Sequence, residues 1–288
     1  MSISHPPTLP DPEQMAAGLR SALPCFRRID WVERTASTNA DLLARARKDD
    51  GQLARPWLLG AHIQENGRGR AGRTWQNRLG ANLMFSCAFD IFLPPRRLPA
   101  LSPLAGLAAC EALRSLIGPE HQAQLLMKWP NDVHWRFSKL AGILVEITRA
   151  GTSRLAADHH VAIVGMGINL EDARALSKSL DRQVADWSEI AAQDAHAASV
   201  GALEMVAAVA RAWYYSYNDA VREGFDTLPQ RYARLDALSG QHINVLDDGR
   251  IVHAGIACGI NELGQLLVRS PDGEIAISAG EISVRLQK

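Results

Sequence analysis

The sequence has few cysteines, and they form no pattern typical of a metal site or a disulfide framework. Cys25, Cys87, Cys110 and Cys258 lie far apart, without a CxxC pair or the Cys/His spacing of a zinc site. We therefore expect four reduced thiols, as is usual in a cytoplasmic protein.

Net charge is also absent, because 31 basic residues balance 31 acidic ones, and no apolar run reaches membrane-spanning length. No overall field attracts the molecule to nucleic acid or to an anionic membrane, so any anion site must be local. Residues 1–14 lack the basic head and apolar core of a secretory signal. These absences predict a cytoplasmic protein without membrane contact.

The length of 288 residues favours one large domain and one small domain. We predict an N-terminal tail and a short helix over residues 1–28, with the helix at 15–23 stopped by Pro24. This stretch is shorter than a helix-turn-helix module, so DNA binding is not expected.

Residues 29–234 alternate between strand and helix patterns, which predicts a mixed α/β core. Apolar runs predict strands at 29–34, 57–64, 82–89, 125–128, 139–147 and 160–166. Residues 37–39 can cap a helix that runs to about residue 48. Helical spacing predicts two further helices at 101–117 and 202–223. Residues 171–200 are polar, alanine-rich and weakly patterned.

After residue 234 the sequence pattern changes to short strand-like runs separated by Gly and Asp/Asn turns. The runs are at 241–246, 251–260, 265–269, 274–277 and 283–286. Because the turns have hairpin chemistry, residues 235–288 are predicted to form a small antiparallel barrel.

A loop rich in glycine and arginine follows the strand predicted at 57–64. Residues 64–73 contain three glycines, which let a ligand approach the backbone, and three arginines, whose forked donors bind carboxylate or phosphate. Such a loop is also compatible with a solvated basic surface or an RNA-binding RG segment. Since two apolar strands frame it, a small anionic ligand is favoured over RNA.

Two further segments place polar groups beside predicted strands. Pro130 is predicted to end the strand at 125–128, which leaves Asn131 and Asp132 where they can face a cleft, although Asn-Asp is also common in turns. Lys139 stands at the mouth of the next strand. It is either an edge lysine or a charge aimed at an anion, and the residues alone leave both open.

Gly165-Met166-Gly167 indicates close approach to the backbone, and Asn169 carries an amide that can pair with a base edge. The sequence contains neither GxGxxG nor a Walker-type GxxxxGK[ST] motif. Nucleotide binding, if present, therefore needs a fold other than the Rossmann or P-loop folds.

Taken together, the motifs resemble those of the biotin protein ligases in both order and spacing. The matching segments are 37–39, 64 with 67–75, 80–83, 128–132, 139–146 and 165–170. The likeness covers about residues 29–288, because 278–285 resembles the end of the family's small C-terminal domain. Some members of the family carry an N-terminal DNA-binding domain. Because only residues 1–28 precede the predicted core here, this chain resembles the monofunctional subgroup that lacks that domain.

The resemblance implies an α+β fold with two domains. A catalytic domain like those of class II aminoacyl-tRNA synthetases and biotin ligases would span residues 29–234, and a small SH3-like β-barrel would span 235–288. The implied activity uses ATP to adenylate biotin and passes biotin from biotinyl-5'-AMP to a lysine of a biotin carboxyl carrier protein. Because this chemistry brings anions together, it also implies Mg²⁺.

The resemblance also implies roles for individual residues, while the metal ligands stay unassigned. Biotin binding is expected from Ser37, Thr38, Asn39, Gln64, Gly67, Arg68, Gly69, Arg70, Lys139 and Gly142. ATP and adenylate binding is expected from Arg68, Arg70, Arg73, Trp75, Lys128, Asn131 and Asn169. Lys139 and Arg70 would act in catalysis, and Asp132 would orient or deprotonate the acceptor amine.

Three other functions stay open at this point. A lipoate-type ligase belongs to the same superfamily, and a non-catalytic biotin or adenylate sensor would need the same pocket. RNA binding is disfavoured by the zero net charge. The expected partner is the carrier protein of acetyl-CoA carboxylase or of a related carboxylase, without DNA. Since the family includes monomers and homodimers, the oligomeric state is open.

Overall fold

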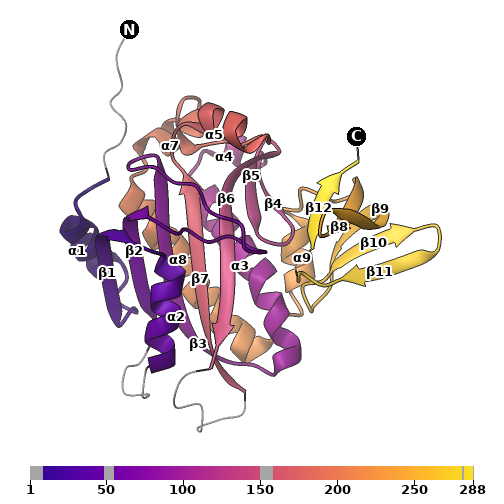
Figure 1. The fold of residues 1–288 in the computed structure, drawn as a ribbon, viewed down its shortest axis with the longest axis horizontal. Coiled ribbons are helices and arrows are strands. Elements are labelled where there is room, and N and C mark those ends of the chain that lie inside the picture. Colours follow the sequence, from indigo (N-terminus) through magenta and orange to yellow (C-terminus); the bar gives the residue numbers. More distant parts are fainter. Residues whose placement is uncertain (1–8, 49–54, 150–157, 281, 288) are drawn as a thin grey trace.

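The larger part of the protein is a seven-stranded mixed sheet (Figure 1). A computed structural model describes residues 9–48, 55–149, 158–280 and 282–287. The strands lie in the order β1-β2-β3-β7-β6-β5-β4, with β1 parallel to β2 and the other neighbours antiparallel. Their bounds are β1 Arg28–Thr35, β2 Trp57–Gln64, β3 Asn82–Phe92, β4 Leu125–Lys128, β5 Asp132–Trp135, β6 Ser138–Thr148 and β7 His159–Asn169.

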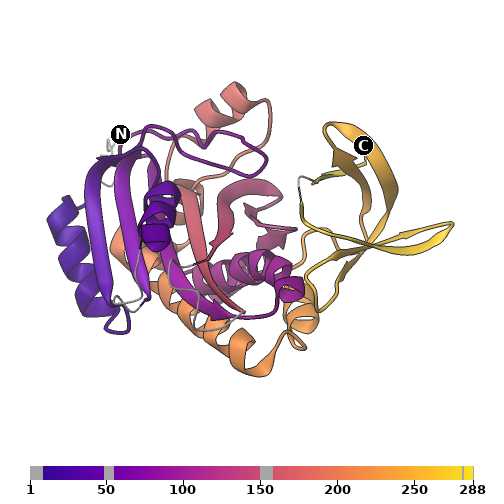
Figure 2. The same cartoon turned by 60° about the horizontal axis from the view of Figure 1, so that its bottom comes forward.

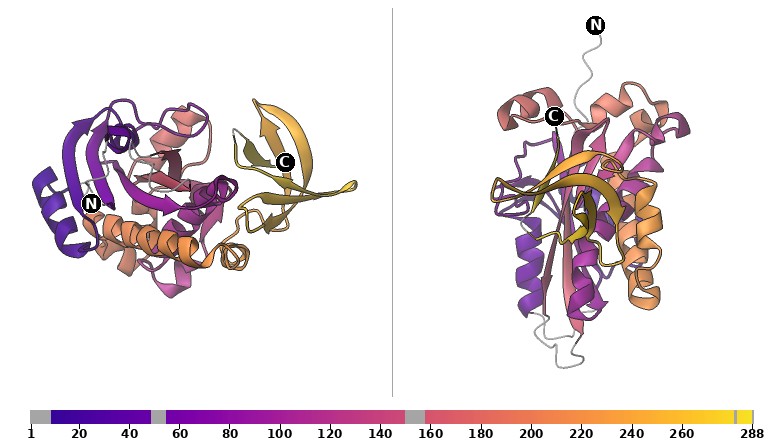
Figure 3. Two further views of the ribbon diagram at one scale, coloured as in Figure 1. Left: turned by 90° about the horizontal axis from the view of Figure 1, so that it is seen from below. Right: turned by 90° about the vertical axis from the view of Figure 1, so that its right-hand side faces the viewer.

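Helices cover both faces of this sheet (Figure 3). Leu42 of α2 (Thr38–Lys48) packs with Trp57 and Leu59 on one face, whereas Leu58 between them joins the core on the other face. The second face is covered by α1 (Pro12–Ala22), α3 (Leu101–Arg114) and α8 (Ala202–Glu223). The shorter helices are η1 Pro95–Ala100, α4 Pro119–Gln122, α5 Ala173–Leu180, α6 Trp187–Ala191, α7 Ala195–Ser199 and α9 Leu228–Ala233.

The C-terminal part is a five-stranded antiparallel sheet in the order β11-β10-β9-β8-β12 (Figure 2). Its strands are β8 His242–Asp247, β9 Arg250–Ile260, β10 Leu266–Ser270, β11 Gly273–Ile277 and β12 Ser283–Leu286. The β8–β9 turn has positive φ at Asp248 and Gly249, as a tight hairpin of type I′ requires. The predicted α+β fold with a small C-terminal β domain is confirmed. The exact boundary at residue 234 stays a prediction.

Two features differ from the sequence-based expectations. Strand β4 ends at Lys128 as predicted, but Asp132 does not stand beyond the sheet, because β5 begins there and pairs with β4 as a hairpin in which Lys128 pairs with Asp132. The weakly patterned stretch 171–200 contains α5, α6 and α7. Asp186 and Asp194 start α6 and α7 by accepting backbone N–H bonds, so side-chain caps rather than an apolar stripe define these short helices.

Two sequence-based expectations about composition can be compared with the structure. All four cysteines lie in the described part of the chain as free thiols, as expected. Within the same residues, no helix combines the length and the apolar character that crossing a bilayer requires.

Candidate active site

A cavity of about 960 Å³ opens between the large sheet and the C-terminal sheet. Its walls come from the loop after β2, from the ends of β4, β5, β6 and β7, from residues 180–183 and from residues 282–285. Most of the predicted site residues line it: Ser37, Thr38, Asn39, Gln64, Arg68, Gly69, Arg70, Arg73, Trp75, Lys128, Asn131, Asp132, Lys139 and Gly142. Gly67 and Asn169 do not.

One end of the cavity is polar and mostly neutral. Thr38 donates its backbone N–H and its hydroxyl to Gln64 Oε1 at 2.7 and 3.1 Å. Ser86 lies 2.7 Å from the Thr38 hydroxyl and donates to Asn39 Oδ1 at 2.6 Å. Because the start of α2 is bonded to β2 and β3 in this way, its side chains are held in place before any ligand arrives. The sequence-based analysis missed Ser86, which lies inside an apolar strand without a motif.

The glycines of β7 are explained by two side chains that lie directly on its backbone. A Cβ at Gly165 would stand 2.1 Å from Asn39 Oδ1, and one at Gly167 would stand 2.3 Å from the Trp75 ring. The predicted close approach is confirmed, and here it is the protein's own side chains that approach. Gly167 therefore allows the Trp75 ring to form part of the cavity wall.

The loop after β2 folds into a small hairpin over the sheet (Figure 1). Gly69 N–H donates to the Arg73 carbonyl at 2.7 Å, and Trp75 N–H donates to the Gly67 carbonyl at 2.9 Å. A Cβ at Gly67 would meet the Trp75 carbonyl at 2.8 Å, so this position needs glycine even though it does not line the cavity. The arginines are thereby carried on an ordered hairpin.

Arg70 connects this hairpin to the C-terminal domain. Its Nη2 donates to the carbonyls of Gly280 at 2.6 Å and Ile282 at 3.2 Å, and also to that of Ala279. Its Nη1 donates to Asn131 Oδ1 at 3.2 Å. Burial lowers the pKa of Arg70, and nearby Asp132 opposes that effect. Among the described residues, the guanidinium is thus a partly buried cation that uncharged oxygens hold directly.

Lys139 and Asp132 form an ion pair of 2.6 Å in the same cavity. Burial by itself would raise the pKa of Asp132, but the charge and hydrogen bond of Lys139 outweigh it, so the pKa lies below its usual value. The carboxylate therefore stays ionised and is a weak base. Lys139 Nζ also lies 5.8 Å from the centroid of the Trp75 ring, within cation–π range.

Several other cations line the cavity and make it electropositive. Arg68 is paired with Glu146 at 3.1 Å, whereas Lys128, Arg73, Arg182 and Arg285 have no acidic partner within 4 Å among the described residues. Burial lowers the pKa of Lys128, which Asp132 opposes and Lys139 reinforces. Unpaired cations in a recess favour bound anions. The sequence-based analysis assigned no role to Arg182, which stands in no local motif, or to Arg285, whose segment 278–285 was noted only for its resemblance to the family's C-terminal domain.

Asn169 is buried and lies at a small side pocket next to the main cavity. Its Oδ1 accepts from Asn82 at 3.2 Å, and its Nδ2 donates to the carbonyls of Lys139 and Ala185 at 3.3 and 3.1 Å. The side chain thus joins β3, β6 and the segment after α5. Since its amide is occupied by these bonds, the predicted contact with adenine stays a prediction.

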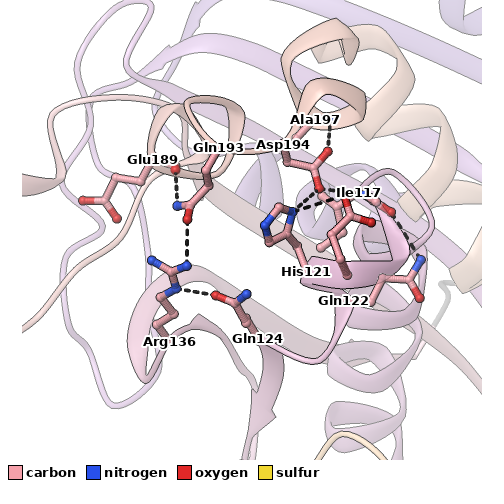
Figure 4. Close-up of polar contacts among 11 residues, drawn as sticks. Ile117, His121, Gln122, Gln124, Arg136, Glu189, Gln193, Asp194 and Ala197 are labelled. Atoms are coloured by element: carbon pink, nitrogen blue, oxygen red, sulfur yellow. Dashed lines mark hydrogen bonds and ion pairs between the residues drawn. The ribbon is translucent and has the colours of Figure 1, made fainter.

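A cluster of Glu120, His121 and Asp194 lies outside the cavity, with ligand atoms close enough for a metal ion. Asp194 accepts backbone N–H bonds from Gly118 at 2.7 Å and Ala197 at 2.9 Å, and it bonds His121 Nδ1 at 2.8 Å (Figure 4). Both of its oxygens are therefore used in joining α4 to α7. These bonds explain the cluster without a metal.

A mixed sheet flanked by helices, with a cationic cavity bounded by a second β domain, is an α+β architecture with a local anion-binding recess, distinct from the Rossmann and P-loop folds. The sequence model of the Biotin/lipoate A/B protein ligase family matches residues 31–169. The model of the Biotin protein ligase C terminal domain matches residues 238–285. The chain belongs to the biotin protein ligase family.

Relatives with known names resemble the chain over most of its length. A biotin–[acetyl-CoA-carboxylase] ligase of Mycobacterium tuberculosis is 30% identical over 263 residues, which is 89% of each chain. One from Paracoccus denitrificans is 32% identical and covers 87% of this chain and 98% of its own length. The Aquifex aeolicus biotin protein ligase solved with biotin and ATP matches at a TM-score of 0.70 and 25% identity, covering 91% of this chain and all of that one.

Proposed function

We propose that this protein is a biotin protein ligase that makes biotinyl-5'-AMP from biotin and ATP and transfers biotin to a lysine of a carrier protein. One observation carries the proposal: a single cavity joins a neutral polar end to a centre of positive charge around Lys139. A vitamin carboxylate and a nucleotide phosphate can meet there. The named relatives support biotin as the substrate over lipoate.

The neutral end of the cavity suits the uncharged ring system of biotin. The start of α2 supplies amide and hydroxyl groups whose orientation is set by bonds among Thr38, Gln64 and Ser86. Such groups pair with a ureido ring through both donors and acceptors. We assign Ser37, Thr38, Asn39 and Gln64 to this end, with Gly67 and Gly69 shaping the loop beside it.

In the first step, the biotin carboxylate attacks the α-phosphorus of ATP and pyrophosphate leaves. The two reacting groups are both anionic, so fixed cations must offset their repulsion. Lys139 and Arg70 fill this role, with Arg68 beside them. Gly142 gives room for Lys139, since a Cβ there would stand 2.9 Å from its Nζ.

The nucleotide would lie against the wall formed by Trp75 and the loop hairpin. Trp75 offers a flat apolar surface for the adenylate, and its ring already lies on the backbone of Gly167. We assign Arg73, Lys128 and Asn131 to the phosphates, because all three line the cavity. Asn169 would contribute from the side pocket.

Mg²⁺ prefers oxygen ligands and is commonly held in nucleotide sites by one or two carboxylates together with phosphates. Asp132 and Asp181 are the carboxylates among the described residues of the cavity wall. Because Lys139 occupies Asp132 Oδ1, this set fits an ion held mainly by ATP. Bound Mg²⁺ would neutralise phosphate charge.

In the second step, the acceptor lysine amine attacks the biotinyl carbonyl, and AMP leaves. Asp132 is ionised and its pKa is lowered, so it suits the binding and orientation of an incoming ammonium better than removal of its proton. We therefore assign Asp132 to the placement of the acceptor. The biotin carboxyl carrier protein as partner, the absence of DNA binding and a cytoplasmic location stay predictions.

The decisive experiment combines the protein with biotin, ATP, Mg²⁺ and an isolated biotin carrier domain. Mass spectrometry should detect one added biotinyl group on the carrier, and pyrophosphate should appear only when biotin and ATP are both present. Lipoate offered in a parallel reaction tests the related activity. A protein that binds biotin but releases no pyrophosphate would be a sensor, contrary to the proposal.

A further inference from the structure

Residues 180–183 bring a cation into the cavity from a segment that neither family model matches. The first match ends at residue 169, and the second begins at residue 238. Between them, α5 ends at Leu180, Asp181 adopts positive φ, and the chain turns so that Arg182 lines both the main cavity and the small side pocket. Arg182 is therefore a cavity cation that lies outside both family-model matches.

The backbone around Arg182 is bonded to the strand that carries Lys139. Lys139 N–H donates to the Gln183 carbonyl at 3.3 Å, and Ala185 N–H donates to the Lys139 carbonyl at 2.9 Å. Arg182 N–H itself donates to the Ser177 carbonyl at 3.3 Å. A short parallel bridge between Lys139 and Val184 completes this arrangement. Arg182 and Lys139 are therefore held in fixed register.

The far side of the segment is anchored as well. Asp186 accepts from the backbone N–H of Ala173 at 2.7 Å, which joins the two ends of the α5 excursion. Beyond it, Gln193 accepts from Arg136 at 2.7 Å, and Asp194 is bonded to α4 (Figure 4). Arg182 thus lies on an ordered wall, which limits the ordering cost of binding a ligand.

The side chain of Arg182 has no hydrogen-bond or ion-pair partner among the residues that the structure describes. Its charge contributes to lowering the pKa of Lys139 and of Lys128, after the larger effect of burial on each, so the three cations are near one another. Lys139 has Asp132 as counter-charge, whereas Arg182 and Lys128 have no carboxylate within 4 Å in the described ranges. Grouped cations repel one another unless an anion lies between them.

We propose that Arg182 binds the β- and γ-phosphates of ATP and holds the pyrophosphate that leaves in the first step. This inference rests on the proposed ligase function and adds a residue to it. Arg70 and Lys139 face the carboxylate and α-phosphate, where the bond forms between the biotin carboxylate oxygen and phosphorus while the bond to pyrophosphate breaks. Arg182 supplies the fixed charge for the departing group.

The test compares Arg182→Gln with Arg174→Gln, which removes an exposed arginine of α5 that lines neither cavity. Loss of one charged contact to phosphate should raise the KM for ATP and the Kd for pyrophosphate about tenfold. The Kd for biotin and the rate of transfer from preformed biotinyl-5'-AMP should stay unchanged. Arg182→Lys should restore part of the affinity, and the control variant should match the wild type.

Two results would overturn this assignment. Unchanged ATP and pyrophosphate affinity in Arg182→Gln would remove Arg182 from the phosphate site. Leakage of biotinyl-5'-AMP, or slow transfer from it, would mean that Arg182 holds the adenylate instead. If the wild-type protein made no biotinyl-5'-AMP, the ligase function would fail, yet direct titration with ATP and with pyrophosphate would still decide the role of Arg182.

Discussion

The ion pair between Lys139 and Asp132 is the residue-scale feature on which the proposed mechanism of both reaction steps rests. Each partner holds the other in place at 2.6 Å, and the proposed mechanism gives each one substrate charge to bind, anionic for Lys139 and cationic for Asp132. Removing one partner leaves the other charged in a largely buried position, which is costly. Substitutions here therefore change the electrostatics of the cavity as well as a contact.

We expect Lys139→Ala to lower the rate of biotinyl-5'-AMP formation roughly 100-fold or more, because a fixed charge at the reacting phosphate is lost. Pyrophosphate release in single-turnover reactions measures this step.

Asp132→Asn should affect transfer to the carrier more than adenylation, since Lys139 keeps its charge. Equal loss in both steps for Asp132→Asn would contradict its assignment to the acceptor lysine.

At the scale of elements, the pairing of β7 with its neighbours controls where Trp75 lies. Because a side chain at Gly167 would overlap the indole ring, the glycine pattern of a central strand determines the position of a loop residue. The strand runs, the Gly/Arg loop and the hairpins of the C-terminal sheet all have local signals in the sequence, so they were predictable. The four-residue strand β5 and the helices α5 to α7 were not predicted, because β5 is short and the helices are marked only by the amphipathic spacing of α5 and by single capping aspartates before α6 and α7.

Gly167→Ala should displace Trp75 from the cavity wall and destabilise the protein by about 1–3 kcal/mol, as overpacked sites do. Adenylate should also dissociate faster. Gly201→Ser is the matched control, because a Cβ at that position meets no atom within 4 Å. Thermal unfolding and the dissociation rate of biotinyl-5'-AMP measure the two effects, and a Gly167→Ala variant that behaves like the control would contradict this role.

At the scale of the whole molecule, the site depends on contacts between the two domains. Arg70 reaches carbonyls of the C-terminal domain, and Trp129 Nε1 donates to the Gly264 carbonyl at 2.9 Å. That the Gly/Arg loop brings cations to a cavity was predictable from its composition. The partners of Arg70 and the entry of Arg182 and Arg285 were not, because contacts between distant segments leave no periodic pattern in the sequence.

Arg70→Gly should release biotinyl-5'-AMP into solution, because it removes both a cation and the bonds that hold the loop hairpin to the C-terminal domain. Chromatography of free adenylate in reactions without carrier measures the leak. Arg70→Lys should retain the charge but lose the multiple carbonyl bonds, since an ammonium lacks the planar fork of donors. Full retention of adenylate by Arg70→Gly would remove this role.

Asp236 lies at the junction between the domains and gives the stability of the protein a pH dependence. Burial raises its pKa from 3.8 to about 6, and its Oδ2 has no hydrogen-bond partner in the described structure. The folded state therefore binds more protons than the unfolded state between these values, so this group lowers stability as pH rises from about 4 to about 6. Asp236→Asn should raise the Tm measured at pH values well above 6, where Asp236 would be charged, and should change Tm little at pH values below 4. Thermal unfolding of both proteins across this pH range tests the assignment. An equal change in Tm at all pH values would contradict it.

The cavity wall runs from Ser37 to Arg285, so its contributors lie far apart in the sequence. Strand β12 and the residue before it supply Ile282, Ser283, Val284 and Arg285 to this wall. A shortened protein without β12 would therefore lose part of the enclosure proposed to keep a hydrolysable adenylate from water, although Arg70 and Lys139 lie outside the removed strand.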